Sequence, residues 1–328
     1  MLYKYVNDIL SFFNRHELIV LTTHDPADAD GLGAQMVMAS ILRKHKIKSR
    51  IINASAIPAH FDYMDARKIV EQWDPEKHGS VPEYSGLLML DTADENTTGP
   101  MKDIIGQFKE VFVIDHHESK DDAVYKGIID STAASTCEMT IDLAKTMGTF
   151  IDKDTAFAAY VGIAYDTGFF AYPKTGAGTF RAALMLYELG VQPYDIYHRL
   201  RENNSLPSLL LQKKAIASMT LHCNNRVAVQ MLRAGDFAET GALPEETEGF
   251  VNFPLRAGNI AVSLFLKETP DKNVRCSLRS KGKVNVAKIA QEFNGGGHHN
   301  AAGFKSDSDI NRTMEAALEK ISAYLDKA

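Results

Sequence analysis

Four short segments of this sequence combine apolar residues with acidic or histidine side chains of the kinds that bind divalent cations. The segments are HDPADAD, LLMLDTAD, VFVIDHH and VGIAYDTG, and the residues of interest are His24, Asp25, Asp28, Asp30, Asp91, Asp115, His116, His117 and Asp166. None of the four contains cysteine, so ions such as Mn²⁺ or Mg²⁺ fit better than soft metals. Carboxylates with two or three imidazoles suit a pair of ions roughly 3.5–4 Å apart. Such a pair activates a water molecule that attacks a phosphoryl group. The predicted chemistry is phosphate-ester hydrolysis.

One aspartate must bridge such a pair of ions, and Asp91, which directly follows an apolar run, is the natural candidate. Each acid taken alone has a simpler explanation. Aspartates of the first segment could cap a helix that starts near Gly31, and Asp166 could end a helix. Three acids and a histidine in one loop repel each other without cations, however, and acids recur at further strand ends. The metal-site interpretation accounts for all four segments together.

The second half of the chain contains a candidate phosphate-binding segment, LRSKGKVNVAKIAQEFNGGGHHNAAGF. Three glycines, Gly295 to Gly297, let the backbone approach a ligand closely, and their NH groups could form an anion-binding nest before a helix that we expect to follow. Arg279 and His298 would add contacts to a phosphate. The alternative is a flexible loop with a solvated arginine. The segment is neither a P-loop nor a dinucleotide-binding fingerprint.

Alternating strands and helices must position the acidic and histidine residues of the four segments. Buried strands are expected at Glu17–Thr23, Arg50–Asn53, Leu87–Leu90, Val111–Ile114 and Gly127–Ile129. Helices are expected at Ala34–Lys44, Ser135–Met147, Asp154–Tyr165 and Thr179–Leu189. This alternation predicts an α/β fold with a mostly parallel sheet flanked by helices, whose strands end at the acidic residues.

After Gly190 the pattern changes to that of a smaller α+β domain. We expect strands at Ile216–His222, Val227–Leu232, Ile260–Leu266 and Val274–Ser280, with a hairpin turn at Asn224 and Asn225, and helices at Val286–Phe293 and Asn311–Leu325. The predicted division is a catalytic domain over residues 1–190, a connector over 191–212 and a substrate-binding domain over 213–328.

Composition restricts the ligand and the compartment. The chain has 328 residues and a formal net charge of −6, so no global basic field attracts long duplex nucleic acid. Three widely spaced cysteines suit a reducing compartment, and no apolar stretch is long enough to cross a membrane. We therefore expect a cytoplasmic protein that acts on short substrates.

Taken in order, the motifs HDPADAD, LDTAD, DHH, YDTG and RSK…GGGHHNAAG resemble the DHH phosphoesterase superfamily, in the branch with a C-terminal DHHA1 domain, over nearly the whole chain. The resemblance implies two domains facing each other across a cleft and two divalent ions, most commonly Mn²⁺, with Mg²⁺ or Co²⁺ as alternatives. One ion would be bound by His24, Asp28 and Asp91, and the other by Asp30, Asp91, His116 and Asp166.

The same resemblance assigns the remaining residues. His117 would stabilise the phosphate or protonate the leaving oxygen, and Asp115 would orient a histidine or a neighbouring backbone group. The nucleotide would be bound by Arg279, Ser280, Gly296, Gly297 and His298. The resemblance also suggests a homodimer.

The function predicted from this resemblance is hydrolysis of short oligoribonucleotides to mononucleotides, with 3′-phosphatase activity on pAp. The nearest alternative is a phosphodiesterase acting on cyclic di-AMP or pApA. An inorganic pyrophosphatase would lack the GGGH domain, and a processive exonuclease would have further nucleic-acid-binding extensions. An alternative of another class, a non-catalytic nucleotide-binding protein, would have lost some of the metal ligands, all of which are present here.

Overall fold

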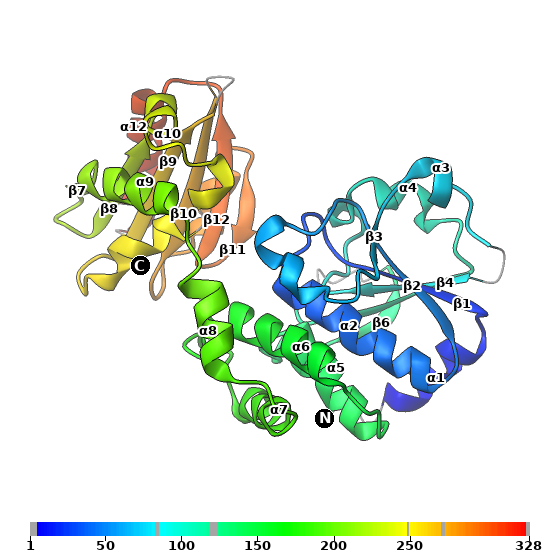
Figure 1. Cartoon of the computed structure of the whole chain (residues 1–328). Coiled ribbons are helices and arrows are strands. Elements are labelled where there is room, and N and C mark those ends of the chain that lie inside the picture. Colours follow the sequence, from blue (N-terminus) through cyan, green and yellow to red (C-terminus); the bar gives the residue numbers. More distant parts are fainter. Residues whose placement is uncertain (1–4, 83–84, 119–123, 248, 270–272, 326–328) are drawn as a thin grey trace. The chain divides into compact units, whose positions relative to one another are not determined.

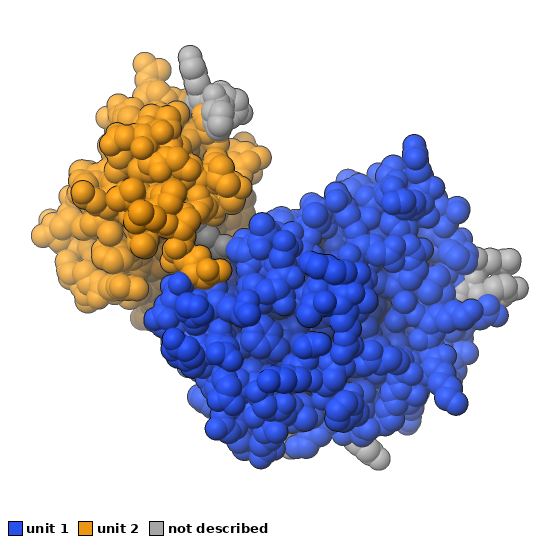
Figure 2. All heavy atoms as spheres, in the orientation of Figure 1, with its two compact units in different colours: residues 1–202 blue, residues 203–328 orange. Residues whose placement is uncertain are grey.

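The chain folds into two compact units, residues 1–202 and 203–328 (Figure 2). The computed structural model describes residues 5–82, 85–118, 124–247, 249–269 and 273–325 (Figure 1). The boundary between the units lies between Glu202 and Asn203, inside the stretch 191–212 that the sequence predicts as a connector. The connector itself stays a prediction.

A parallel sheet forms the centre of the first unit. Its described strands are β1 (Leu18–Thr22), β2 (Lys48–Asn53), β3 (Val70–Gln72), β4 (Ser85–Leu90), β5 (Glu110–Asp115) and β6 (Lys126–Ile129), in the order β3-β2-β1-β4-β5-β6. Every neighbouring pair among them is parallel, so the predicted α/β fold is confirmed. The chain order reverses between β1 and β4, where open α/β sheets place their ligands.

Helices cover both faces of this sheet. They are α1 (Val6–Asn14), α2 (Ala29–Lys44), α3 (Pro75–His78), α4 (Lys102–Ile105), α5 (Thr136–Thr146), α6 (Lys153–Asp166), α7 (Ala177–Glu188) and α8 (Pro193–Arg201), with short 3₁₀ turns η2 (Ala59–Met64), η3 (Glu95–Thr97) and η4 (Gly99–Met101). Helices α2, α5 and α6 lie on one side of the sheet and α4 on the other (Figure 1). Ile19 and Leu21 of β1 pack in the core with α2, α5 and α6, whereas Val20 packs in a second core with α4. Burial on both faces explains why the strands are continuously apolar.

Helix α2 begins earlier than the sequence pattern predicts. We expected a loop up to Gly33 and a helix from Ala34, but the helix starts at Ala29. The cause is Asp28, whose side chain accepts hydrogen bonds from the backbone NH groups of Asp30 (3.0 Å) and Gly31 (3.1 Å) and so caps the helix. Asp30 consequently lies in the first turn of a rigid helix.

The second unit is built on a mixed sheet with the order β11-β12-β10-β9-β8-β7. The strands are β7 (Thr220–His222), β8 (Val227–Leu232), β9 (Val262–Glu268), β10 (Val274–Ser280), β11 (Gly296–His298) and β12 (Ala301–Ser306), and the helical elements are α9 (Leu206–Ala217), α10 (Ala234–Thr240), η5 (Pro244–Thr247), η6 (Phe250–Arg256), α11 (Val286–Gln291) and α12 (Ile310–Leu325). Helices α11 and α12 pack on one face, and α9 and η6 pack on part of the other.

Two expectations for this unit are wrong. The strand expected from Ile216 starts only at Thr220, because the preceding residues belong to α9. No helix directly follows the three glycines either: β11 turns at His299 and Asn300 into β12 and pairs with it in antiparallel register. The glycines permit this pairing, since a Cβ at Gly297 would lie 2.4 Å from the Ala301 carbonyl oxygen. The predicted hairpin turn at Asn224 and Asn225 is confirmed.

In the described part of the chain, no helix is both long and apolar enough to span a bilayer. All three cysteines are free thiols, and Cys137 and Cys276 are buried.

Helices α2 and α6 cross so closely that Gly162 of α6 has no room for a side chain. A Cβ at this position would lie 2.5 Å from Cys137 Sγ and 2.8 Å from the Ala29 carbonyl oxygen. Although alanine favours helices, we predict that Gly162→Ala lowers the free energy of unfolding by about 1–3 kcal/mol, because overpacking displaces α2. Denaturant unfolding measures this effect. Gly106→Ala, where a Cβ would meet nothing within 4 Å, should be neutral, and equal stabilities of the two variants would contradict the packing argument.

Candidate metal centre

The acidic and histidine residues predicted from the four segments come together at the carboxyl ends of β1, β4 and β5. His24 follows β1, Asp91 follows β4, and Asp115 is the last residue of β5. Asp28 and Asp30 stand at the beginning of α2, and Asp166 is the last residue of α6. The site therefore lies where the strand order reverses, next to two helix ends.

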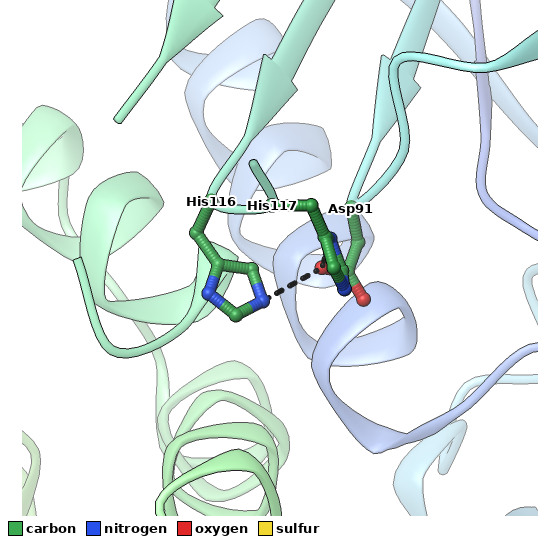
Figure 3. Close-up of side chains that lie close together, drawn as sticks. All are labelled: Asp91, His116 and His117. Atoms are coloured by element: carbon green, nitrogen blue, oxygen red, sulfur yellow. Dashed lines mark ion pairs between the residues drawn. The ribbon is translucent and has the colours of Figure 1, made fainter. Parts of the chain in front are cut away.

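These side chains form three groups in which the ligand atoms lie within 4.8 Å of one another. The groups are His24, Asp28 and Asp91; Asp30, His116 and Asp166; and Asp91, His116 and His117. Figure 3 shows the third, with the ion pair between the His116 ring and the Asp91 carboxylate marked. The structure thus brings together all the residues predicted as metal ligands.

Asp91 presents its two oxygens to different groups. Oδ2 lies 3.5 Å from His24 Nε2, whereas Oδ1 lies 3.5 Å from His116 Nε2 and 3.7 Å from His117 Nδ1. The residue is buried and has a positive φ of 61°, a conformation that aspartate tolerates better than most residues. Its NH donates to the Ile114 carbonyl at 3.0 Å, and Oδ1 accepts from Thr136 Oγ1 at 2.9 Å. The orientation of the Asp91 carboxylate is therefore fixed by the backbone and by α5.

The N-terminus of α5 holds the second acid of the centre, a role that the sequence analysis missed. Asp30 is fully buried, and its carboxylate accepts from the NH groups of Thr136 (2.6 Å) and Cys137 (2.9 Å). Ser135 caps the same helix by accepting from the NH of Glu138. The Ser-Thr-x-Glu spacing of a helix start is readable in the sequence, but its contact with Asp30, about a hundred residues away, is not.

The local charge is strongly negative. Burial, together with the charge of Asp166, raises the pKa of Asp30 to about 6, and burial with the charge of Asp30 raises the pKa of Asp91 well above its usual value. Burial lowers the pKa of His24 and His116, but the adjacent carboxylates outweigh this effect and bring the two values to about 11 and about 10. Without metal, protons on the histidines compensate the buried carboxylates.

The surroundings of His116 fit a metal ion better than a hydrogen bond. Its Nε2 lies 2.9 Å from Asp166 Oδ2, 3.5 Å from Asp91 Oδ1 and 3.8 Å from Asp30 Oδ2. Both ring nitrogens are buried, and neither makes a well-aligned hydrogen bond within the described residues. Several ligand atoms that converge on one point are what a divalent cation requires.

Asp115 and His117 form a separate pair at the edge of the centre. Asp115 Oδ1 lies 2.8 Å from His117 Nδ1 and accepts from the His117 NH at 3.1 Å. Burial raises the pKa of Asp115, but the interaction with His117 prevails and the pKa is lowered overall. The side chain of His117 is 36% exposed against 7% for His116, so an incoming molecule can reach it.

The predicted nucleotide-binding residues lie in the second unit and only partly converge. Arg279 of β10 is paired in register with Ala301 of β12, which is paired in turn with His298 of β11. The side chain of His298 lies outside the described residues. Ser280 faces the opposite side of the sheet, where its hydroxyl donates to the Val284 carbonyl and accepts from Asn300 Nδ2. Its hydroxyl is therefore part of the fold.

Comparison with known families identifies both units. The model of the DHH family, N-terminal domain, matches residues 18–163, and the DHHA1 domain matches residues 224–327. The chain belongs to the DHH family. All the residues of the three groups except Asp166 lie inside the first match, and the predicted nucleotide-binding residues lie inside the second. This DHH–DHHA1 protein is a metal-dependent phosphoesterase.

Relatives and solved structures agree with this assignment. The chain is 27% identical to a protein of Thermus thermophilus named bifunctional oligoribonuclease and PAP phosphatase NrnA, over 94% of this chain and 91% of that protein. It is also 27% identical to a cyclic-di-AMP phosphodiesterase, PdeA, of Listeria monocytogenes, over 75% of this chain but 37% of that protein. The crystal structure of an exopolyphosphatase-related protein from Bacteroides fragilis superposes with a TM-score of 0.90 at 25% identity, covering 98% of this chain and 96% of that one.

The raised pKa values make metal binding depend on pH. Between pH 6.5 and 9 the metal-free folded state keeps protons on His24 and His116 that the unfolded chain loses, so its stability falls by about 1.4 kcal/mol per pH unit for each retained proton. A metal ion displaces these protons, and therefore the rise in Tm on adding Mn²⁺ should be larger at pH 8.5 than at pH 6.5. Thermal unfolding with and without metal measures this. A rise in Tm that is the same at both pH values would contradict the presence of protons on His24 and His116 in the metal-free protein. The variant Asp91→Ala should lose most of the rise in Tm on adding Mn²⁺.

Proposed function

We propose that this DHH–DHHA1 protein hydrolyses short oligoribonucleotides to mononucleotides and removes the 3′-phosphate of pAp, using two divalent ions. The observation that supports two ions is Asp91, whose oxygens point to two different groups of ligands. Relatives such as the Thermus protein, whose name gives these substrates, support the choice of substrate.

Each ion has its own set of ligands in this proposal. His24, Asp28 and Asp91 would hold one, and Asp30, Asp91, His116 and Asp166 would hold the other. Mn²⁺ is the first choice because carboxylate and imidazole ligands suit it, with Mg²⁺ or Co²⁺ as substitutes. Two such ions lower the pKa of a bound water and neutralise the charge of a phosphoryl group.

His117 is the proposed proton donor to the oxygen of the leaving group. Asp115 holds its ring in one orientation through the 2.8 Å contact with Nδ1. The partial exposure of His117 suits contact with substrate, whereas the buried His116 suits metal binding. In the second unit, we propose that Arg279 and the backbone of Gly296 and Gly297 bind a phosphate, together with His298. Ser280 takes no direct part in this proposal, because its backbone NH donates to the Asn300 carbonyl.

The second candidate is cleavage of cyclic di-AMP or pApA, supported by the Listeria relative. The same metal centre would serve, because both substrates are phosphodiesters. The non-catalytic alternative fits less well, because the proposed metal ligands all belong to groups whose ligand atoms lie within 4.8 Å of one another. A reducing compartment, the cytoplasm, suits three free cysteines.

The test of the function is a hydrolysis panel with Mn²⁺ that contains RNA of two to five nucleotides, pAp, pApA and cyclic di-AMP. We predict that the wild-type protein cleaves the short RNAs and pAp, and that Asp91→Ala reduces turnover at least about a thousandfold, because both ions lose a ligand. Asp154→Ala, an exposed acid on α6, is the matched control and should be fully active.

Two results would change the proposal. Preference for cyclic di-AMP or pApA over RNA would favour the second candidate. Unchanged turnover of Asp91→Ala would exclude the two-ion mechanism for any substrate.

A second copy of the chain is the proposed partner of helix α7. Phe180, Leu184 and Tyr187 lie at helical spacing on one face, and each is more than half exposed. Arg181 and Glu188 flank this stripe, so two antiparallel copies related by a two-fold axis near Leu184 would place the arginine of one beside the glutamate of the other. An exposed apolar stripe with such self-complementary charges fits a homodimer.

Light scattering at micromolar concentration tests the dimer. We predict that the wild-type protein is dimeric and that Leu184→Asp is monomeric, because the substitution buries an unpaired charge in the contact. Leu209→Asp, on an exposed position of α9, should leave the dimer intact. A monomeric wild-type protein, or a dimer unaffected by Leu184→Asp, would exclude this interface.

A further inference from the structure

Three cations stand side by side on one face of the sheet in the second unit. Lys267 of β9, Arg275 of β10 and Lys305 of β12 are direct neighbours in the strand register. Arg275 and Lys305 are exposed, and Lys267 is partly buried. We call these three residues the cationic row.

The cationic row is not neutralised by ion pairs. None of its members makes an ion pair with another described residue, and like charges directly opposite each other on neighbouring strands are unfavourable. Burial and the charge of Arg275 lower the pKa of Lys267, an effect that the nearby Glu245 opposes. Lys267 Nζ donates to the Pro244 carbonyl and to Thr247 Oγ1, which fixes its position. Such an arrangement is stabilised when a polyanion binds.

Between the cationic row and the proposed phosphate-binding residues, the part of the face formed by β10, β12 and β11 is lined by small residues. Ser277, Gly303 and Gly296 are neighbours in the register, and a Cβ at Gly296 would meet nothing within 4 Å. Beyond them lies Arg279, four residues from Arg275 along the same strand and on the same face. An extended chain can therefore lie close to the sheet between the two arginines.

The distance between the two arginines suits an oligonucleotide. Four residues of a β-strand span about 13 Å. Stacked nucleotides advance about 3.4 Å each along one strand, so roughly four stacked nucleotides, or fewer in an extended chain, cover this span. A dinucleotide bound at Arg279 would end before it reached the row.

We propose that the cationic row binds the backbone phosphates of RNA beyond the first nucleotides, so that it sets the length preference of the enzyme. The proposal rests on the proposed function, because it takes Arg279 to bind the end of the same RNA. The row favours substrates of four or five nucleotides over dinucleotides, and it acts on binding without taking part in the chemical step.

The test compares the affinity of the protein for a fluorescent pentanucleotide and a dinucleotide in the absence of metal, so that neither is cleaved. For the double variant Arg275→Gln, Lys305→Gln we expect Kd for the pentanucleotide to rise about tenfold or more and Kd for the dinucleotide to stay unchanged. The slope of log affinity against log salt for the pentanucleotide should become shallower by about 1.4, since two phosphate contacts are lost.

Two further variants act as controls. Arg312→Gln, Lys320→Gln removes the same charge from α12, which covers the other face of the sheet, and should change neither affinity. Arg279→Ala should weaken the binding of both the pentanucleotide and the dinucleotide. Thermal unfolding of the row variant should give a Tm at or above that of the wild type, because repulsion between neighbouring cations is removed.

An equal effect of the row variant on both RNAs, or no effect on either, would overturn the proposal. Absence of RNA cleavage by the wild-type protein with Mn²⁺ would instead contradict the proposed function, and the ratio of the two affinities would still decide the role of the row.

Discussion

The crowding of buried carboxylates around Asp91 is the constraint on which the first unit depends. Asp91 and Asp30 are almost completely buried, Asp28 and Asp166 lie beside them, and two histidines separate the charges. Ionised carboxylates at this density are stable only with protons or cations between them. A site of this kind favours the folded structure when metal is bound and opposes it at high pH when metal is absent. Metal binding, proton release and stability are therefore parts of one equilibrium.

The fold resists this repulsion through the backbone. Parallel strands deliver His24, Asp91 and Asp115 to one edge, and the N-termini of α2 and α5 supply NH donors to Asp28 and Asp30. Helix N-termini carry a partial positive charge, so they stabilise anions even before a cation binds. The tight crossing of α2 and α6 adds rigidity, because it leaves no free volume beside Ala29 and Gly162.

The two units contribute different kinds of chemistry. In the proposed function, the metal centre acts on the phosphate ester and selectivity comes from contacts further along the substrate. The sheet of the second unit is the proposed source of these contacts, since one of its faces carries cationic residues with glycine and serine between them. An overall charge of −6 with locally concentrated cations suits short, single-stranded anions better than duplexes. Under this proposal, substitutions in the second unit can change the preferred RNA length without changing the metal centre.

The sequence by itself determined the class of fold and the identity of the clustered acids and histidines, because apolar runs that end in Asp91 or Asp115 have few explanations other than buried parallel strands with a site at their ends. It misplaced the start of α2, and it missed the β11–β12 hairpin, since glycine-rich segments carry no hydrophobic period and the pairing partner determines their conformation. Only the tertiary structure showed that α5 holds Asp30, that the Ser280 hydroxyl belongs to the fold, and that three cations line up across β9, β10 and β12. Each of these depends on residues far apart in the chain, and the relative position of such residues is fixed by packing and strand register.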